Sequence, residues 1–146
     1  MSPVQKNVTV ELQTIIDDHG QMEYNKQKQR GKFYQKGQLH VLTFDEKTED
    51  QSIIKNLITI HKHKVSIKRS GPISMNQQFV LKQVTENVYK HPLGLIHMET
   101  FTDELIYKEH PNQTGGELIM EYRVKMNGQE ERKHKLELTF SEEDSA

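Results

Sequence analysis

The chain has 146 residues, of which 33% are hydrophobic, and 20 basic side chains nearly balance 21 acidic ones, for a formal net charge of -1. This length suits one domain, and we expect a single domain over residues 1–146. The charge balance favours neither nucleic acid nor an anionic membrane as a partner. The absence of cysteine excludes disulfides, thiolate metal sites and cysteine nucleophiles.

The amino-terminal residues lead directly into an alternating segment and contain no apolar signal core. No apolar run approaches the roughly 20 residues of a membrane-spanning helix. A polar chain without disulfides is what a reducing compartment favours. We therefore expect a cytoplasmic protein without a membrane partner.

The first predicted strand carries apolar and β-branched residues at every second position: Val8, Val10, Leu12, Thr14 and Ile16. This period of two is typical of a half-buried strand. Residues 17–20, Asp-Asp-His-Gly, have turn chemistry, and Met22 and Tyr24 then open a return strand.

The return strand continues into a basic segment, residues 26–34, which ends in Phe33 and Tyr34. Basic residues next to aromatic ones are one signature of single-strand nucleic-acid binding. Because the segment is short and the whole chain is slightly acidic, a solvated strand face is the favoured interpretation. No nucleic-acid partner is predicted.

The strongest helix candidate is segment 49–57, although it is short and lacks sustained helical periodicity. The overlapping segment 53–60 has Ile53 and Leu57 on one face of a strand and Ile54, Ile58 and Ile60 on the other. A barrel strand in water needs only one apolar face. We therefore expect a second subunit to cover an outer patch in a homodimer.

Among the eight histidines, His61 and His63 would share one strand face and could hold a metal ion. They lie beside Lys62 and Lys64, so a solvated turn is the favoured interpretation and no metal site is predicted. His97 and Glu99 would share a face with Leu95 and Phe101, and their apolar neighbours suit either an acid/base pair or a buried polar pair.

Two polar side chains are predicted to point toward the core from segment 65–80. Alternation places Arg69 with Val65 and Ile67, and it places Gln77 on a face with apolar residues. A buried arginine stays charged and needs acceptors. Glu99 and Glu86 are the predicted partners in a structural pair, and an anionic ligand is the alternative.

The clearest stripe runs through Leu118, Met120, Tyr122, Val124 and Met126. Asn127-Gly128 follows directly and predicts a two-residue hairpin turn, because both residues tolerate positive φ. His134, Leu136, Leu138 and Phe140 then share one face of the partner strand. With the other turn signals this gives about ten short strands. The fold class predicted is all-β, a closed antiparallel barrel of eight to ten strands, since closure removes the two open edges of a sheet.

Short motifs in the same order as in a known family support this fold. Residues 69–71 (Arg-Ser-Gly), 75–77 (Met-Asn-Gln) with Phe79, and 89–94 (Tyr-Lys-His-Pro-Leu-Gly) followed by Glu99 and Thr100 resemble the YwiB-like family of bacterial proteins. The resemblance covers nearly the whole chain and implies a calycin-like, lipocalin-type barrel in the bacterial cytoplasm. It implies no activity. The chain has no tryptophan, so it lacks the glycine–x–tryptophan signature of lipocalins.

The leading functional hypothesis is a non-enzymatic module that binds a small molecule inside the barrel, because a small barrel can hold one small ligand. The predicted ligand-binding residues are Arg69, Gln77, His97, Glu99 and Tyr122. No cofactor and no catalytic residue are predicted. The alternatives are an interaction protein with a filled barrel and a partner-binding outer face, and an enzyme that uses His97, Glu99 or Arg69.

Overall fold

The computed structural model describes residues 5–111 and 114–143. In this part of the chain ten antiparallel strands form a closed barrel, and they follow one another around it in chain order until β10 pairs with β1. The strands are β1 (Lys6–Asp18), β2 (Gln21–Lys36), β3 (Leu39–Lys47), β4 (Ile53–His61), β5 (Lys64–Ser70), β6 (Ser74–Val80), β7 (Val84–His91), β8 (Gly94–Glu109), β9 (Gly115–Met126) and β10 (Arg132–Glu142). The predicted closed antiparallel barrel is confirmed.

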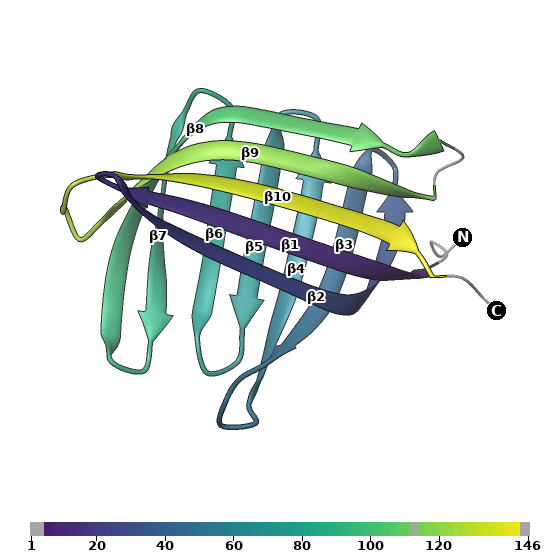
Figure 1. The fold of residues 1–146 in the computed structure, drawn as a ribbon, viewed down its shortest axis with the longest axis horizontal. Helices are drawn as coiled ribbons and strands as arrows, with labels where there is room; N and C mark the ends of the chain where they lie inside the picture. Colours follow the sequence, from purple (N-terminus) through teal and green to yellow (C-terminus); the bar gives the residue numbers. More distant parts are fainter. Residues whose placement is uncertain (1–4, 112–113, 144–146) are drawn as a thin grey trace.

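The barrel has two unlike walls (Figure 1). The long strands β8, β9, β10, β1 and β2 run across the front of the view, and the shorter strands β3 to β7 cross behind them. The chain returns beside its own beginning, so both ends of the described chain lie at the same end of the barrel. Pairing of β1 with β10 closes the sheet, so the first and last strands are not left as its edges.

Segment 49–57, the strongest helix candidate in the sequence, forms no helix. Residues 48–52 form a tight turn in which the Gln51 N–H donates to the Thr48 carbonyl at 3.1 Å, and β4 begins at Ile53. Gln51 has φ 71°, which interrupts any helix at that point. The described part of the chain contains no helix that could span a membrane.

The inner faces of the strands predicted by alternation are confirmed for β1, β9 and β10. Directly paired residues share a face, and Val10 pairs with Phe140, Leu12 with Leu138, and Leu136 with Met120. A contiguous apolar core lies between the two walls: Val8, Val10, Leu42, Phe44, Ile58, Ile60, Val65, Ile67, Phe79, Met98, Leu118, Met120, Tyr122, Val124, Leu136, Leu138 and Phe140.

The turn predicted at Asn127-Gly128 is present. Both residues have positive φ, 51° and 71°, and the Gln129 N–H donates to the Met126 carbonyl at 2.9 Å. Regular pairing resumes only at Val124 and Arg132, so the connection is longer than the two-residue hairpin predicted. The Asn127 side chain also accepts a bond from the His97 N–H at 2.8 Å, which ties the turn to β8.

Two surface predictions are also resolved by the structure. Ile53 and Leu57 lie on the outer face of β4 and are 51% and 37% exposed, as the alternation indicated. His61 and His63 lie at an exposed turn between β4 and β5, as favoured for that segment. In the described residues, no three histidine, aspartate or glutamate side chains are grouped as a metal site would require.

Candidate functional site

A row of polar side chains crosses the inner face of the long-strand wall. Thr102 on β8 pairs with Tyr122 on β9, and Tyr122 pairs with His134 on β10. The register continues the row to Ile16 on β1 and Glu23 on β2. We call Thr102, Tyr122 and His134 the interior polar row, because all three side chains face the inside of the barrel.

The two rings of this row are stacked. The Tyr122 and His134 ring centroids lie 5.1 Å apart at an interplanar angle of 25°, and Phe79 meets Tyr122 edge-on at 4.7 Å. Burial raises the pKa of Tyr122 far above its usual range. Burial, with a smaller contribution from the charge of Arg132, lowers the pKa of His134 to about 4. Both rings are therefore uncharged at neutral pH.

Three buried polar atoms on inner faces have no hydrogen-bond partner among the described residues. They are Thr102 Oγ1, His134 Nε2 and, on β7, Asn87 Oδ1. Asn87 faces inward because it pairs with Met98, a core residue. Buried polar atoms in proteins are nearly always paired, since each unpaired one costs about 1–3 kcal/mol. These three atoms therefore offer unused hydrogen-bonding capacity to the barrel interior.

Gln77 and Thr100 form a satisfied polar contact in the same interior. Gln77 Nε2 donates to Thr100 Oγ1 at 2.9 Å, and both residues are buried, with 6% and 0% exposure. Gln77 thus points inward from β6, as alternation predicted. Thr100 lies two residues before Thr102 on the same face of β8, so a satisfied and an unsatisfied hydroxyl are neighbours.

Arg69 also faces inward, but its partner is Glu46. Arg69 Nη2 lies 3.2 Å from both Glu46 carboxylate oxygens, and Asn56 Nδ2 donates to Glu46 Oε1 at 2.8 Å. The predicted partners Glu99 and Glu86 are wrong. The three side chains come together because Asn56 on β4 pairs with Arg69 on β5, while Glu46 approaches from β3 on the other side of β4.

The barrel interior is open to solvent along part of β2. This strand pairs with β1 from Gln21 to Phe33, but with β3 only from Gly31 to Lys36. We call the interior beside residues 21–30 of β2 the open half, and the interior where β2 and β3 are paired the closed half. On the inner face of the open half, Glu23 and Asn25 are exposed, and Gln27 and Gln29 are half-buried.

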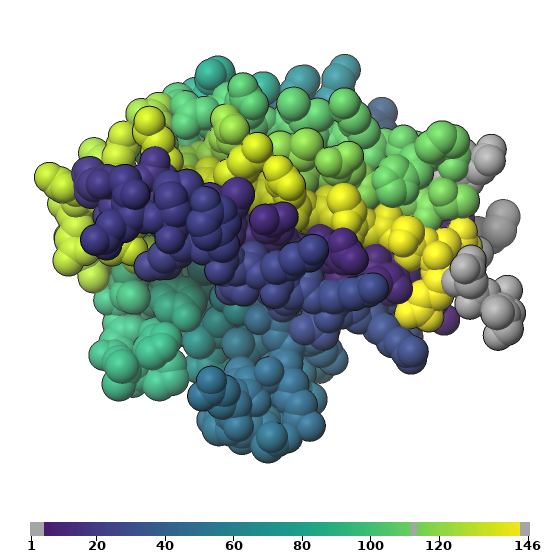
Figure 2. All heavy atoms as spheres, viewed as in Figure 1, coloured from purple at the N-terminus to yellow at the C-terminus, as the bar shows by residue number. Residues whose placement is uncertain are grey.

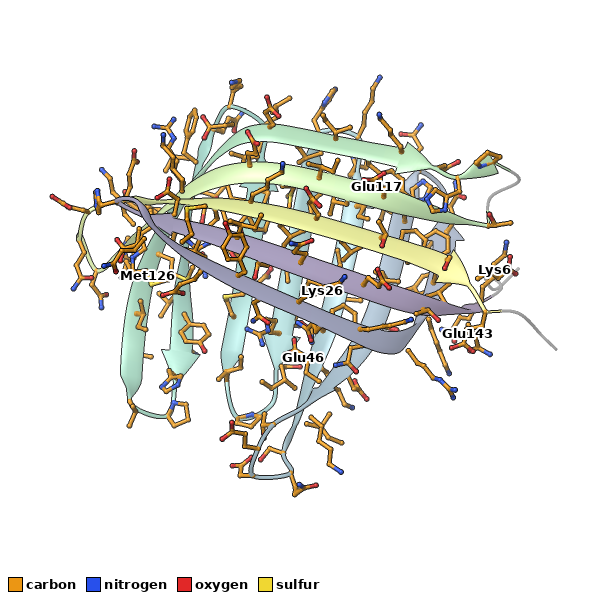
Figure 3. The ribbon with its side chains drawn as sticks, viewed as in Figure 1. Lys6, Lys26, Glu46, Glu117, Met126 and Glu143 are labelled. Carbon is orange, nitrogen blue, oxygen red and sulfur yellow. The ribbon has the colours of Figure 1, made fainter. Side chains whose placement is uncertain are left out.

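The surface is hollowed beside this opening. Figure 2 shows a recess below β2, between the β3–β4 turn and the β7–β8 turn. Arg69, Ile73 and Tyr89 line a hollow of about 510 Å³ between these same turns. Glu46, labelled in Figure 3, lies below β2 where β2 and β3 have diverged. This hollow reaches the inward-facing Arg69 at the rim of the open half.

The placement predicted for His97 and Glu99 is wrong, because both lie on the outer face of the barrel. His97 is 47% exposed and lies 3.9 Å from Glu86, which is 63% exposed. The inner face of this part of β8 carries Met98, Thr100 and Thr102 instead. A register shift between Thr102 and Glu104 reverses the inward parity of β8, so Leu105 and Tyr107 face inward although Leu95 does not.

The structure thus brings Gln77 and Tyr122 into the interior, places Arg69 at the opening beside Glu46, and separates His97 and Glu99 from all three. The polar residues that the sequence analysis missed have one feature in common. Each lies on a strand face that also carries core residues or residues packed against the core. They are Glu46, Asn56, Asn87, Thr100, Thr102 and His134.

A second polar cluster lies in the closed half and is fully paired. The Tyr107 hydroxyl lies 3.3 Å from His40 Nδ1, and His40 Nε2 lies 3.2 Å from Glu109. Burial, and then the charge of Glu109, raises the pKa of Tyr107, so its hydroxyl stays protonated beside His40. Both imidazole nitrogens are occupied, and this cluster fastens β3 to β8.

Comparison with known proteins extends over nearly the whole chain. A family model described as "Domain of unknown function (DUF1934)" matches residues 10–138. The chain is 24% identical over 133 residues to the uncharacterized beta-barrel protein YwiB of Bacillus subtilis (strain 168), covering 91% of this chain and 92% of that protein. The crystal structure of ywiB protein from Bacillus subtilis superposes with a TM-score of 0.84 at 22% identity, covering 96% of this chain and 94% of the other. The predicted resemblance to YwiB-like barrel proteins is confirmed.

Proposed function

Since this chain belongs to the DUF1934 family, we propose that it is a non-enzymatic binding module that takes one small, uncharged, hydrogen-bonding molecule into the open half of its barrel. The observation that carries the proposal is the set of unpaired buried atoms at Thr102, His134 and Asn87. A ligand that bonded to them would recover a desolvation cost that the protein alone leaves uncompensated.

The charges of the open half favour an uncharged ligand. His134 is neutral at pH 7 because burial lowers its pKa to about 4. The guanidinium of Arg69 is already neutralised by Glu46 at 3.2 Å. Apart from the exposed carboxylate of Glu23, the inner face offers amide and hydroxyl groups from residues such as Gln27, Gln29 and Thr102. These groups donate and accept in comparable numbers, as suits a polyol, an amide or a nucleoside.

Apolar side chains at the same opening would enclose the carbon skeleton of such a molecule. Leu12, Met75, Tyr89, Ile96 and Met126 are half-buried and pack against the core from the open side. A site with an apolar wall and a few converging polar groups is the usual composition of a small-molecule site. The same lining suits a ligand with one apolar and one hydroxylated face.

The test is a thermal-shift screen of uncharged polyols, amides and nucleosides, followed by calorimetry on each compound that raises the melting temperature. Thr102→Val removes one unpaired hydroxyl at nearly constant volume and should reduce the shift. Thr59→Val, a matched change on the outer face of β4, should leave it unchanged. The proposal fails if no compound binds, or if Thr102→Val and Thr59→Val retain the same affinity.

A partner-binding outer face is the second candidate function, and exposed apolar residues of the β7–β8 hairpin favour it. Leu93 is 91% exposed, Leu95 68%, Val84 59% and Val88 44%. With Ile53 and Leu57 on β4, these residues are the apolar surface that a homodimer would cover. Light scattering at micromolar concentration tests this candidate, because a monomer mass would reject the homodimer.

A further inference from the structure

Half of β2 has a strand neighbour on one side only. Residues 21–30 pair with β1, whereas the first pair between β2 and β3 joins Gly31 and Phe44. The main-chain N–H and C=O groups that point away from β1 along residues 21–30 therefore have no strand partner. Residues 21–26 are exposed throughout, and in Figure 1 the strand β3 diverges from β2 toward the β3–β4 turn. We call residues 21–30 the open edge.

The fork between β2 and β3 is built by close approach of the two backbones. A side chain on Gly31 would place its Cβ 2.6 Å from the Thr43 carbonyl oxygen, so only glycine fits there. A hollow of about 400 Å³ begins at this point, lined by Arg30, Thr43, Phe44 and Asp45 among others. The geometry leaves room beside the open edge for an additional extended segment.

The outer face along the open edge and the fork is basic. Lys26, Lys28, Arg30 and Lys32 alternate on one face of β2, and Lys26 is labelled on that face in Figure 3. Lys28 lies 3.8 Å from Glu11, and Arg30 lies 3.6 Å from Glu143, both as exposed pairs that contribute little. Within the described residues, Lys26 and Lys32 have no ion-pair partner.

We propose that the open edge is a docking strand for an extended acidic segment of another protein. Such a segment would continue the sheet by main-chain hydrogen bonds to residues 21–30, and its alternate carboxylates would lie beside the basic row. This is the mode by which peptides add to exposed sheet edges, with backbone bonds for affinity and side chains for selection. It uses the main-chain groups at the rim of the open half rather than the interior polar row, and it does not depend on a ligand there.

The charge of the edge argues against a second copy as its occupant. Two open edges placed side by side would bring two basic rows together, and like charges opposite one another destabilise a strand pair. Lysines on edge strands suppress such self-association. A nucleic acid would match the basic row but could not use the ladder of peptide groups. An acidic extended peptide satisfies both features.

The experiment measures fluorescence anisotropy with a labelled eight-residue peptide of alternating glutamate and threonine. Its control peptide alternates glutamate and proline, which keeps the charge but removes every second main-chain donor and so disfavours an added strand. We expect the first peptide to bind at least ten-fold more tightly than the second. Amide hydrogen exchange at residues 21–30 should slow when it binds.

Protein variants distinguish binding at the open edge from general attraction of the peptide to positive charge. Lys26→Glu with Arg30→Glu should weaken the glutamate–threonine peptide at least ten-fold, whereas Lys62→Glu with Lys64→Glu, in the exposed β4–β5 turn, should not. Equal binding of both peptides, absence of binding, or tighter binding of a ten-residue thymidine oligonucleotide would each overturn the proposal. The proposal would also be overturned if the protein had the mass of a dimer and the edge substitutions converted it to a monomer, because the open edge would then bind a second copy of the chain.

Discussion

The closed and open halves of the barrel differ along single strands. On β1, Val8 and Val10 are each 1% exposed, while Leu12, Thr14 and Ile16 on the same face are only half-buried. The change occurs where β2 loses its pairing with β3. Where that pairing is complete the interior is apolar and its polar groups are bonded. Where the pairing between β2 and β3 is missing, the inner face carries amides, hydroxyls and a neutral histidine. Strand pairing at one junction therefore decides which part of the interior is fully buried and which part is only half-buried.

The sharpest test of this difference uses one cross-strand pair. Leu12 on β1 lies directly opposite Leu138 on β10, but Leu138 is fully buried and Leu12 is not. We expect Leu138→Ala to lower the free energy of unfolding by about 3–5 kcal/mol and Leu12→Ala by about 1–2 kcal/mol. Urea denaturation measures both. Equal costs would show that the open half is as well packed as the closed half.

Acid should act on the open half through His134. Its pKa is about 4 in the folded barrel, compared with about 6.5 when unfolded. Between these values the unfolded chain takes up a proton that the folded chain does not. The free energy of unfolding should therefore fall as the pH drops from 6.5 to 4, by about 3 kcal/mol from this group, and be constant above 6.5.

The measurement compares wild type with His134→Phe across that range of pH. Phenylalanine retains the stack on Tyr122 and cannot titrate, so the difference between the two proteins isolates the histidine. His97→Phe, a change on the outer face, is the matched control. Parallel pH profiles for wild type and His134→Phe would show that the imidazole is solvated in the folded state.

Arg69 tests the rim of the open half. Arg69→Met leaves Glu46 with only the bond from Asn56, and should destabilise the barrel by about 1–2 kcal/mol. This is less than for a fully buried pair, because the two side chains are 26% and 19% exposed. A double-mutant cycle with Glu46→Gln gives the coupling. If the coupling is below about 0.3 kcal/mol, the pair is not structural.

A substitution at Gly128 tests the turn that connects β9 and β10. Its φ of 71° is costly for a β-branched residue, although no atom lies within 4 Å of a Cβ placed there. Gly128→Val should therefore cost about 1–2 kcal/mol from backbone strain alone. Gly128→Asn, which tolerates this conformation, should cost less. An unchanged melting temperature for Gly128→Val would mean that the loop relaxes freely.

Alternation in the sequence predicted the closed barrel and the inner faces of β1, β9 and β10, because these strands keep one parity from end to end. It failed on β8 because Leu95 and Phe101, which set the predicted inner face, lie on the outer face of the barrel, before the register shift at residues 102–104. Leu95 is 68% exposed and therefore misled the assignment of His97 and Glu99. The Arg69 partner was missed for another reason: Glu46 lies on β3, and alternation within segment 65–80 says nothing about which residue of another strand faces Arg69. Partners across strands depend on register, which one sequence does not specify.

Two neighbouring threonines give the finest test, with the smallest effects and opposite signs. Thr100 and Thr102 are the same residue type, and both are fully buried on the inner face of β8. Thr100 accepts a bond from Gln77 at 2.9 Å, whereas Thr102 Oγ1 has no partner in the described structure.

Thr100→Val would leave the Gln77 amide unpaired and should destabilise the protein by about 1 kcal/mol or more. Thr102→Val removes an uncompensated hydroxyl and should be neutral or stabilise by about 0.5 kcal/mol. Urea denaturation measures the free energy of unfolding of both variants. Thr59→Val is the control for the general effect of replacing threonine by valine. If Thr102→Val costs as much as Thr100→Val, its hydroxyl is already satisfied in the free protein, and the interior polar row has no hydrogen-bonding capacity left for a ligand.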